Sequence, residues 1–230
     1  MDKPRLPFPL RFFDREDEYL VVEGDLPHWC QSGTLCFITW RTCDSMPREV
    51  LERWYSERDD WLAKHGISAD GPWWKQLHSL PLAAQGEFQK LRHEKWESSL
   101  DECHGECLLE RRDVGRLVAD SLMHFDEQRY VITDYVVMPN HVHVLAAFPD
   151  ADNMLAQCDS WKHFTAVKVN EATGRSGRFW QSEAFDHLVR SLEQFEYLRT
   201  YIATNPRNAK LRTDQYFHYS RDLTSYKDCN

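Results

Sequence analysis

The sequence predicts a protein that mixes β-strands with amphipathic helices, and three features support this. Residues 129–137 and 141–148 are β-branched and aromatic runs joined by a Met-Pro-Asn turn, and so short a connection requires an antiparallel hairpin. Helical periodicity precedes the hairpin over 113–127 and follows it over 153–170. An earlier aromatic run over 35–42, bounded by Gly and Asp, predicts another strand.

Length and composition favour one domain with an insertion. The chain has 230 residues, of which 42% are hydrophobic, enough for a core. No stretch approaches the roughly 20 apolar residues of a membrane span, and the N-terminus lacks the apolar segment of a signal peptide. We therefore expect a cytoplasmic protein with reduced thiols. Cys103 and Cys107 resemble half a zinc site, but no second Cys/His pair stands at a usable distance.

The remaining segments follow in chain order. Residues 1–34 show no steady period and are expected to form an N-terminal arm. Ser45 is the expected N-cap of a helix that opens an acidic helical insertion over 45–100. A last strong helix begins after the N-cap Ser191 and is expected to end before Pro206. The main domain is thus expected over 35–212, with 213–230 as a polar C-terminal tail.

Charge alone does not favour a nucleic-acid binder, because the formal net charge is −9. The charge is uneven, however: residues 160–212 hold nine Lys or Arg against five acids. A local basic surface can recruit phosphates on an acidic protein, since salt confines such fields to about 8–10 Å. An ordinary solvated surface explains the same pattern and is preferred on charge alone.

Two histidines in the hairpin are the first candidates for chemistry. His141 and His143 are two residues apart on a predicted strand, so both side chains leave the same face of the sheet. Two neutral imidazoles pointing one way can bind a metal ion. Two unrelated surface histidines would look the same in a sequence, so the pair by itself is weak support.

The last helix offers further polar groups beside an apolar stripe. Tyr197, Tyr201 and Asn205 recur every four residues and line one flank of that stripe. A phenol one turn before an amide could place both groups beside one metal ion. The alternative is that the tyrosines are rim residues with hydrated hydroxyls.

Together these segments resemble a known family. The segment 135–145, YVVMPNHVHVL, resembles the His-hydrophobe-His motif of single-tyrosine HUH transposases. Later blocks resemble its REP-associated branch, the REP-associated tyrosine transposases: Trp161-Lys162-x-Phe164-Thr165-Ala166, Gly177-Arg178-Phe179-Trp180-Gln181, Phe185-Asp186-His187, Arg190 and Tyr201-Ile202-x-x-Asn205-Pro206. Upstream, Asp101, Gly105, Cys107, His124-Phe125-Asp126 and Arg129-Tyr130 extend the resemblance over roughly residues 100–212.

The resemblance implies an α+β fold of the HUH type, a ferredoxin-like antiparallel sheet flanked by helices, with the insertion after the first strand. It makes His141, His143 and Asn205 ligands of Mg²⁺ or Mn²⁺, and Tyr201 the nucleophile. The implied activity is nicking and joining of single-stranded DNA at hairpins through a 5′-phosphotyrosine intermediate. The implied setting is a bacterial cytoplasm, in association with the nucleoid, with a monomer favoured and a dimer possible.

Base stacking and phosphate binding are expected from the aromatic and basic residues of the later blocks. The DNA-binding candidates are Trp161, Lys162, Arg178, Trp180, Arg190 and Arg207. Two other functions stay open. One is a domesticated protein that binds structured nucleic acid without cutting it. The other is a metal hydrolase acting through an activated water, which lacks the usual carboxylate ligands here.

Overall fold

The computed structural model describes residues 5–22, 28–77, 79–81, 83–88, 91, 104–181 and 184–225. The chain divides into two compact units. The first, which we call the sheet unit, consists of Met1–Cys43 and Cys107–Asn230, and the second, the helical unit, is Asp44–Glu106. Within the described ranges, no helix is both long enough and apolar enough to cross a membrane.

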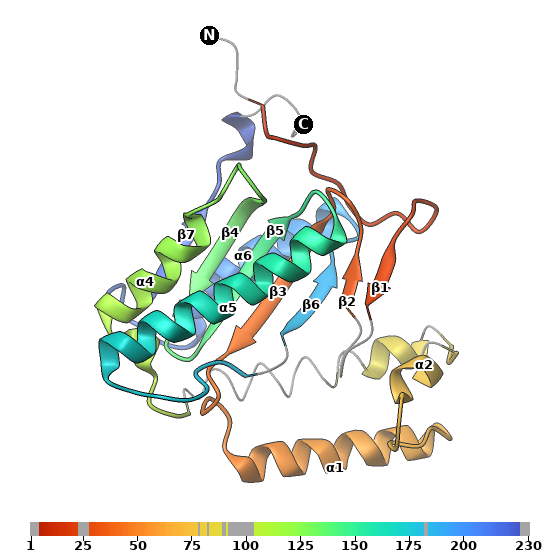
Figure 1. Ribbon diagram of the computed structural model, residues 1–230. Helices are drawn as coiled ribbons and strands as arrows, with labels where there is room; N and C mark the ends of the chain where they lie inside the picture. Colours follow the sequence, from red (N-terminus) through yellow and green to blue (C-terminus); the bar gives the residue numbers. More distant parts are fainter. Residues whose placement is uncertain are drawn as a thin grey trace. The chain divides into compact units, whose positions relative to one another are not determined.

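A five-stranded antiparallel sheet forms the centre of the sheet unit (Figure 1). Its strand order is β6-β3-β5-β4-β7, and each neighbouring pair is antiparallel. The strands are β3 (Leu35–Arg41), β4 (Val131–Val137), β5 (His141–Ala147), β6 (Phe185–Leu188) and β7 (Phe217–Ser220). Every residue of β3, β4 and β5 is buried, because helices cover both faces of the sheet.

Three helices cover the sheet. Helices α4 (Arg112–Met123) and α5 (Ala151–Thr173) lie on the near face in Figure 1, and α6 (Leu192–Asn208) lies behind the sheet. The sequence of elements β3-α4-β4-β5-α5-β6 is the βαββαβ order of a ferredoxin-like fold. The predicted α+β class, with an antiparallel sheet flanked by helices, is therefore confirmed.

Each sheet face has its own apolar core. On the α4/α5 face, Val118, Leu122 and Trp161 pack on alternate strand residues such as Ile38 and Val144. On the α6 face, Leu198 and Ile202 pack with Phe37, Leu145 and Val136. Because strand side chains alternate between faces, the odd-numbered residues of β3 and β5 face α6. This alternation decides which side chains share a face with the histidine pair.

Both ends of the chain contribute structure to the sheet unit. In the N-terminal arm, β1 (Leu20–Val22) and β2 (His28–Cys30) form a two-stranded sheet, and the Arg11 backbone bonds to Gly33 and Leu35. In the segment expected to be a polar tail, β7 pairs with β4 as an edge strand. The interpretation of 213–230 as a plain tail was wrong because a four-residue strand on a sheet edge carries too short a pattern to recognise.

The helical unit contains α1 (Arg48–Lys64) and α2 (Trp73–Leu77), and Trp61 contacts Phe88 in its interior. Helix α1 has Pro47 at its N-cap and no side-chain cap bond, so the expected capping by Ser45 was wrong. The sheet unit also contains two short 3₁₀ helices, η1 (Leu108–Glu110) and η2 (Leu223–Ser225).

The cysteines differ in oxidation state. Cys107 is disulfide-bonded, whereas Cys30, Cys36, Cys43 and Cys158 are free. The expectation of reduced thiols is therefore wrong at Cys107. Cys103, the other half of the possible zinc site, lies outside the described residues.

Candidate active site

The two histidines of β5 lie side by side beneath α6. His141 and His143 have ring centroids 4.7 Å apart, and they are 1% and 0% exposed. Both belong to the odd-numbered set that faces α6. The local cause is the strand period of two, which puts the two imidazoles on one face while Val142 enters the opposite core.

Each imidazole is oriented through its Nδ1 atom. His141 Nδ1 lies 2.7 Å from Asn140 Oδ1, and His143 Nδ1 lies 2.7 Å from Thr39 Oγ1. An amide oxygen only accepts hydrogen bonds, so Nδ1 of His141 carries the proton and Nε2 keeps its lone pair. That Nε2 atom is buried and has no hydrogen-bond partner.

His141 is held neutral. Its burial, and secondarily the nearby Arg41 guanidinium, lower the pKa of His141 from 6.5 to about 3. A neutral imidazole can bind a metal ion without first losing a proton. The lone pair on His141 Nε2 is thus available at neutral pH.

Tyr201 reaches the histidine pair from α6. Its hydroxyl lies 3.3 Å from His143 Nε2, and the two ring centroids are 5.2 Å apart. The tyrosine ring also meets the edge of Phe37 at 6.0 Å between centroids. The final helix therefore folds back onto the mid-chain hairpin and brings a phenol to the imidazoles.

Two contacts set the direction of α6 across the sheet. The Arg199 guanidinium binds Asp134, whose strand partner on β5 is Leu145. Tyr201 lies two residues after Arg199 on α6, and it contacts His143, which lies two residues before Leu145 on β5. As α6 advances, it therefore passes back along β5 and runs antiparallel to that strand.

The rise of the helix and of the strand indicates that Asn205 reaches the level of His141. Four helical residues advance about 6 Å, close to the roughly 6.8 Å spanned by two strand residues. Asn205 is one helical turn beyond Tyr201 on α6, and His141 is two residues before His143 on β5. Asn205 is 1% exposed, and its Oδ1 atom is buried without a hydrogen-bond partner.

The residues present fit a metal ion. Buried polar atoms in proteins are nearly always paired, yet His141 Nε2 and Asn205 Oδ1 are not. A cation bound by both atoms and by His143 Nε2 would satisfy them. Among the described residues, no group of three or more His, Cys, Asp or Glu could hold a metal. The histidine pair therefore forms a three-ligand site only together with the Asn205 amide. Two nitrogen atoms and one oxygen atom are a ligand set that accepts Mg²⁺ or Mn²⁺.

Sequence reasoning missed Arg41, which is a buried cation beside this site. Arg41 is the strand partner of His141, it faces α6 like Thr39, and it is 2% exposed. The period of two along the predicted strand 35–42 places Thr39 and Arg41 on one face. That pattern could not predict that this strand pairs with β5, because strand pairing is a tertiary contact.

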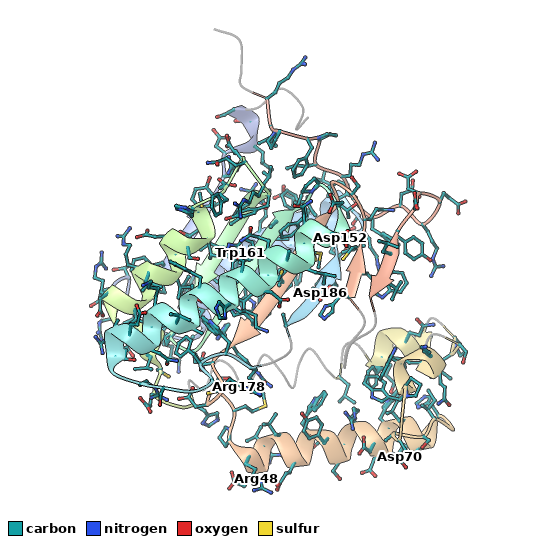
Figure 2. All side chains as sticks on the ribbon, in the orientation of Figure 1. Arg48, Asp70, Asp152, Trp161, Arg178 and Asp186 are labelled. Carbon is teal, nitrogen blue, oxygen red and sulfur yellow. The ribbon has the colours of Figure 1, made fainter. Side chains whose placement is uncertain are left out.

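Two of the basic candidates lie toward the His141 end of the sheet. Arg207 is exposed and follows Asn205 by two residues on α6. Arg178 is exposed, and its carbonyl accepts a hydrogen bond from Cys43 Sγ, just beyond the end of β3 (Figure 2). Arg178 and Arg207 therefore lie toward the end of the sheet nearer His141.

The other two basic candidates lie elsewhere. Lys162 is half-buried on α5, which covers the opposite face of the sheet. Arg190 is exposed but precedes the first turn of α6, at the far end of that helix from Asn205. The structure does not bring Lys162 or Arg190 to the histidine pair.

The two tryptophan candidates are core residues. Trp161 is 2% exposed and stacks on Trp40, while its indole N–H points to the Tyr130 hydroxyl at 3.3 Å. Trp180 is 3% exposed and donates to Thr165 Oγ1 at 2.8 Å. Neither ring has a free face for a base, so their expected stacking role is corrected to core packing.

Comparisons with known proteins do not assign this chain to a family. No family model matches the sequence, and no curated protein matches it. Among solved structures, the chain is similar to a REP-associated tyrosine transposase bound to a REP hairpin. That match has a TM-score of 0.42 and 11% sequence identity, and it covers 89% of this chain and 98% of the other.

Proposed function

We propose that this protein is a metal-dependent enzyme that nicks and rejoins single-stranded DNA, with Tyr201 as the covalent nucleophile. The observation that carries the proposal is the meeting of the Tyr201 hydroxyl with His143 Nε2, beside two buried acceptors without partners on His141 and Asn205. A phenol can act as a covalent nucleophile, and two imidazoles with an amide oxygen can hold a divalent cation.

In the proposed reaction, Tyr201 Oη attacks phosphorus and forms a P–O bond while the P–O3′ bond breaks. The 3′ oxygen leaves and gains a proton, and the phosphate stays on the tyrosine through its 5′ side. One phosphoester bond replaces another, so a 3′-hydroxyl can reverse the step and join strands without ATP. A bound Mg²⁺ or Mn²⁺ would neutralise a non-bridging oxygen and polarise the phosphorus.

The chain's own residues prepare this reaction. Tyrosine is a weak nucleophile at neutral pH because its pKa is about 10, so positioning must supply much of the rate. Phe37 and His143 hold the phenol in place, and Asn140 and Thr39 hold the imidazoles. The Arg41 guanidinium adds a fixed positive charge for the phosphate in a buried site, where such a charge acts strongly.

The site favours a flexible strand. His141, His143 and Asn205 are at most 1% exposed, so the target phosphate must bend into the sheet-helix interface. Arg178 and Arg207 lie at the rim near His141 and are proposed to contact flanking phosphates. A hairpin beside the cleavage site is kept as the expected partner, on the strength of the motif resemblance.

The test is a covalent attachment assay. The purified chain is incubated with hairpin-flanked single strands and Mn²⁺ or Mg²⁺, and a denaturing gel detects protein joined to DNA. Attachment should require the metal, stop with EDTA and vanish in Tyr201→Phe. Tyr197→Phe is the matched control, because Tyr197 lies one turn earlier on α6 and is 59% exposed. Full attachment by Tyr201→Phe would refute the nucleophile.

A second candidate is a domesticated protein that binds structured nucleic acid without cutting. The near-complete burial of His141 and His143 favours it, because imidazoles this enclosed are hard for a phosphate to reach. This candidate predicts hairpin binding that ignores EDTA, survives loss of both imidazoles and gives no adduct with any strand.

A further inference from the structure

A pocket lies on the sheet face opposite the histidine pair. It has a volume of about 190 Å³ and is formed between α5 and the edge of the sheet at β6 and β2. Its lining combines apolar and charged side chains: His28, Ile38, Met154, Leu155, Cys158, Asp159, Lys162, Ala184 and Asp186. None of the proposed metal ligands belongs to it.

Asp186 is the unusual group in this pocket. It is the strand partner of Ile38, so it faces α5 rather than α6 (Figure 2). Its side chain is 3% exposed, and Oδ1 is held by Nδ1 of His28. The second oxygen, Oδ2, is buried and has no hydrogen-bond partner. A buried carboxylate oxygen without a donor is costly, and because the Asp186 side chain lines the pocket, a ligand that donates a hydrogen bond to it would remove this cost.

The lining restricts the chemistry of that ligand. Asp186 and Asp159 repel a phosphate, so an anionic group does not fit beside them. Ile38, Met154 and Leu155 offer apolar surface for a flat ring. The volume is below the roughly 300–1,000 Å³ of sites for drug-sized molecules, which limits the occupant to about one ring system.

We infer that this pocket binds one unpaired nucleobase with an exocyclic amino group. The amino group of adenine, cytosine or guanine would donate to Asp186 Oδ2, as carboxylates accept from cytosine N4 in direct readout. The base ring would lie against Met154 and Leu155. The inference rests on the proposed function for the source of the base, a single strand handled by this protein.

The recognition of a base extruded from its strand follows a general pattern. Such pockets combine hydrogen bonds to a base edge with contact from apolar side chains. Here the pocket is on the α5 face, whereas cleavage is proposed on the α6 face. The pocket would therefore fix which base is anchored, and so where along the strand the Tyr201 site acts.

The test measures base binding directly, without metal or cleavage. Methyl-labelled methionines of the full-length chain are followed by NMR in EDTA while each of the four deoxynucleosides is added to about 20 mM, enough to detect millimolar binding. The Met154 methyl should move with deoxyadenosine, deoxycytidine or deoxyguanosine, and at least about tenfold less readily with thymidine. The Met138 methyl, buried on the α6 face, should not move.

Two variants and one control complete the test. Asp186→Asn should weaken binding of the best nucleoside by about tenfold, since an amide is a weaker acceptor than a carboxylate. Leu155→Trp should close the pocket from its half-exposed side and abolish the Met154 shift. Asp152→Asn, exposed on the same helix and outside the pocket lining, should bind as the unmodified chain does.

The outcomes separate this inference from the proposed function. An unmoved Met154 methyl with all four nucleosides, or a shift with ethanolamine and none with nucleosides, would overturn the base pocket. Neither result bears on covalent attachment by Tyr201. Conversely, nucleoside binding that is lost in Asp186→Asn supports the pocket even if no adduct ever forms.

Discussion

At the scale of residues, the imidazoles of the proposed metal site are fixed by neighbours that carry no charge. Asn140 Oδ1 and Thr39 Oγ1 each contact an Nδ1 atom at 2.7 Å, and His143 Nε2 faces the Tyr201 hydroxyl. Outer partners of this kind fix the tautomer and the ring angle of metal-binding histidines. Asn140 stands next to His141 in the sequence, whereas Thr39 comes from a strand about a hundred residues earlier.

The first prediction concerns Asn140. Removal of its amide in Asn140→Ala frees the His141 ring to rotate and to exchange tautomers. The Mn²⁺ affinity should fall by about 10–100-fold, as measured by isothermal titration calorimetry. Asn208→Ala, an exposed change on α6, should leave the affinity unaltered. Equal affinities for the two variants would contradict an orienting role.

The second prediction concerns competition at His143 Nε2. The Tyr201 hydroxyl lies 3.3 Å from this atom, and a metal ion binds it only in the tautomer that carries the proton on Nδ1. A bound metal must displace that hydroxyl. Tyr201→Phe removes the competitor, so it should bind Mn²⁺ at least as tightly as the unmodified chain while losing all attachment to DNA. Calorimetry and the denaturing gel together check both halves. A large loss of Mn²⁺ affinity would instead make Tyr201 a ligand.

At the scale of elements, one ion pair fixes the position of α6 on the sheet. Arg199 Nε bonds to both carboxylate oxygens of Asp134, at 3.1 and 3.0 Å, and the Asp134 side chain is 1% exposed. Arg199 also donates to Ser220 Oγ and to the Arg221 carbonyl. The same side chain therefore joins α6, β4 and the edge strand β7, two residues before the proposed nucleophile.

The third prediction tests that attachment. Arg199→Met leaves the Asp134 carboxylate buried without its cation, which should lower the free energy of unfolding by about 3 kcal/mol. Urea denaturation measures this change. Arg212→Met is the control, because the Arg212–Asp214 pair is exposed and such pairs contribute about 0–1 kcal/mol. If both variants lose the same stability, the buried pair does not anchor α6.

Helix boundaries show how far local patterns reach. Ser191 Oγ accepts the Gln194 N–H, so the predicted N-cap of α6 is confirmed. The predicted end before Pro206 was wrong, since α6 continues to Asn208 with Pro206 inside it. Proline disfavours helical geometry in the preceding residue, but here the last turn packs on the sheet, and Asn205 and Pro206 are buried. Tertiary packing overrode the local preference.

At the scale of the whole molecule, the helical unit is an insertion in the chain of the sheet unit. The two positions of the sheet unit between which it is inserted lie close together. Thr42 N–H bonds to the Asn140 carbonyl, and Leu109 N–H bonds to the Pro139 carbonyl, in the same turn. The chain thus leaves and re-enters the sheet unit at adjacent places. An insertion of this kind can be long without disturbing the fold, because the entropic cost of loop closure grows slowly with loop length.

The fourth prediction follows from those adjacent ends. Replacement of residues 44–106 by a Gly/Ser linker of about five residues should leave a chain that folds and still attaches to DNA through Tyr201. Circular dichroism and the denaturing gel give the two readouts. A folded product that binds DNA but forms no adduct would assign part of the reaction to the helical unit.

The sequence by itself determined the antiparallel hairpin, the flanking helices and the common face of His141 and His143, because these follow from the periods of strands and helices. It also singled out Tyr201 and Asn205 through their spacing. Only the tertiary structure decided that α6 runs back along β5 and that Arg41 and Thr39 border the histidines. It likewise placed Trp161 and Trp180 in the core and left Asp186 Oδ2 without a donor. Strand order and helix direction depend on contacts between distant residues, which no local period encodes.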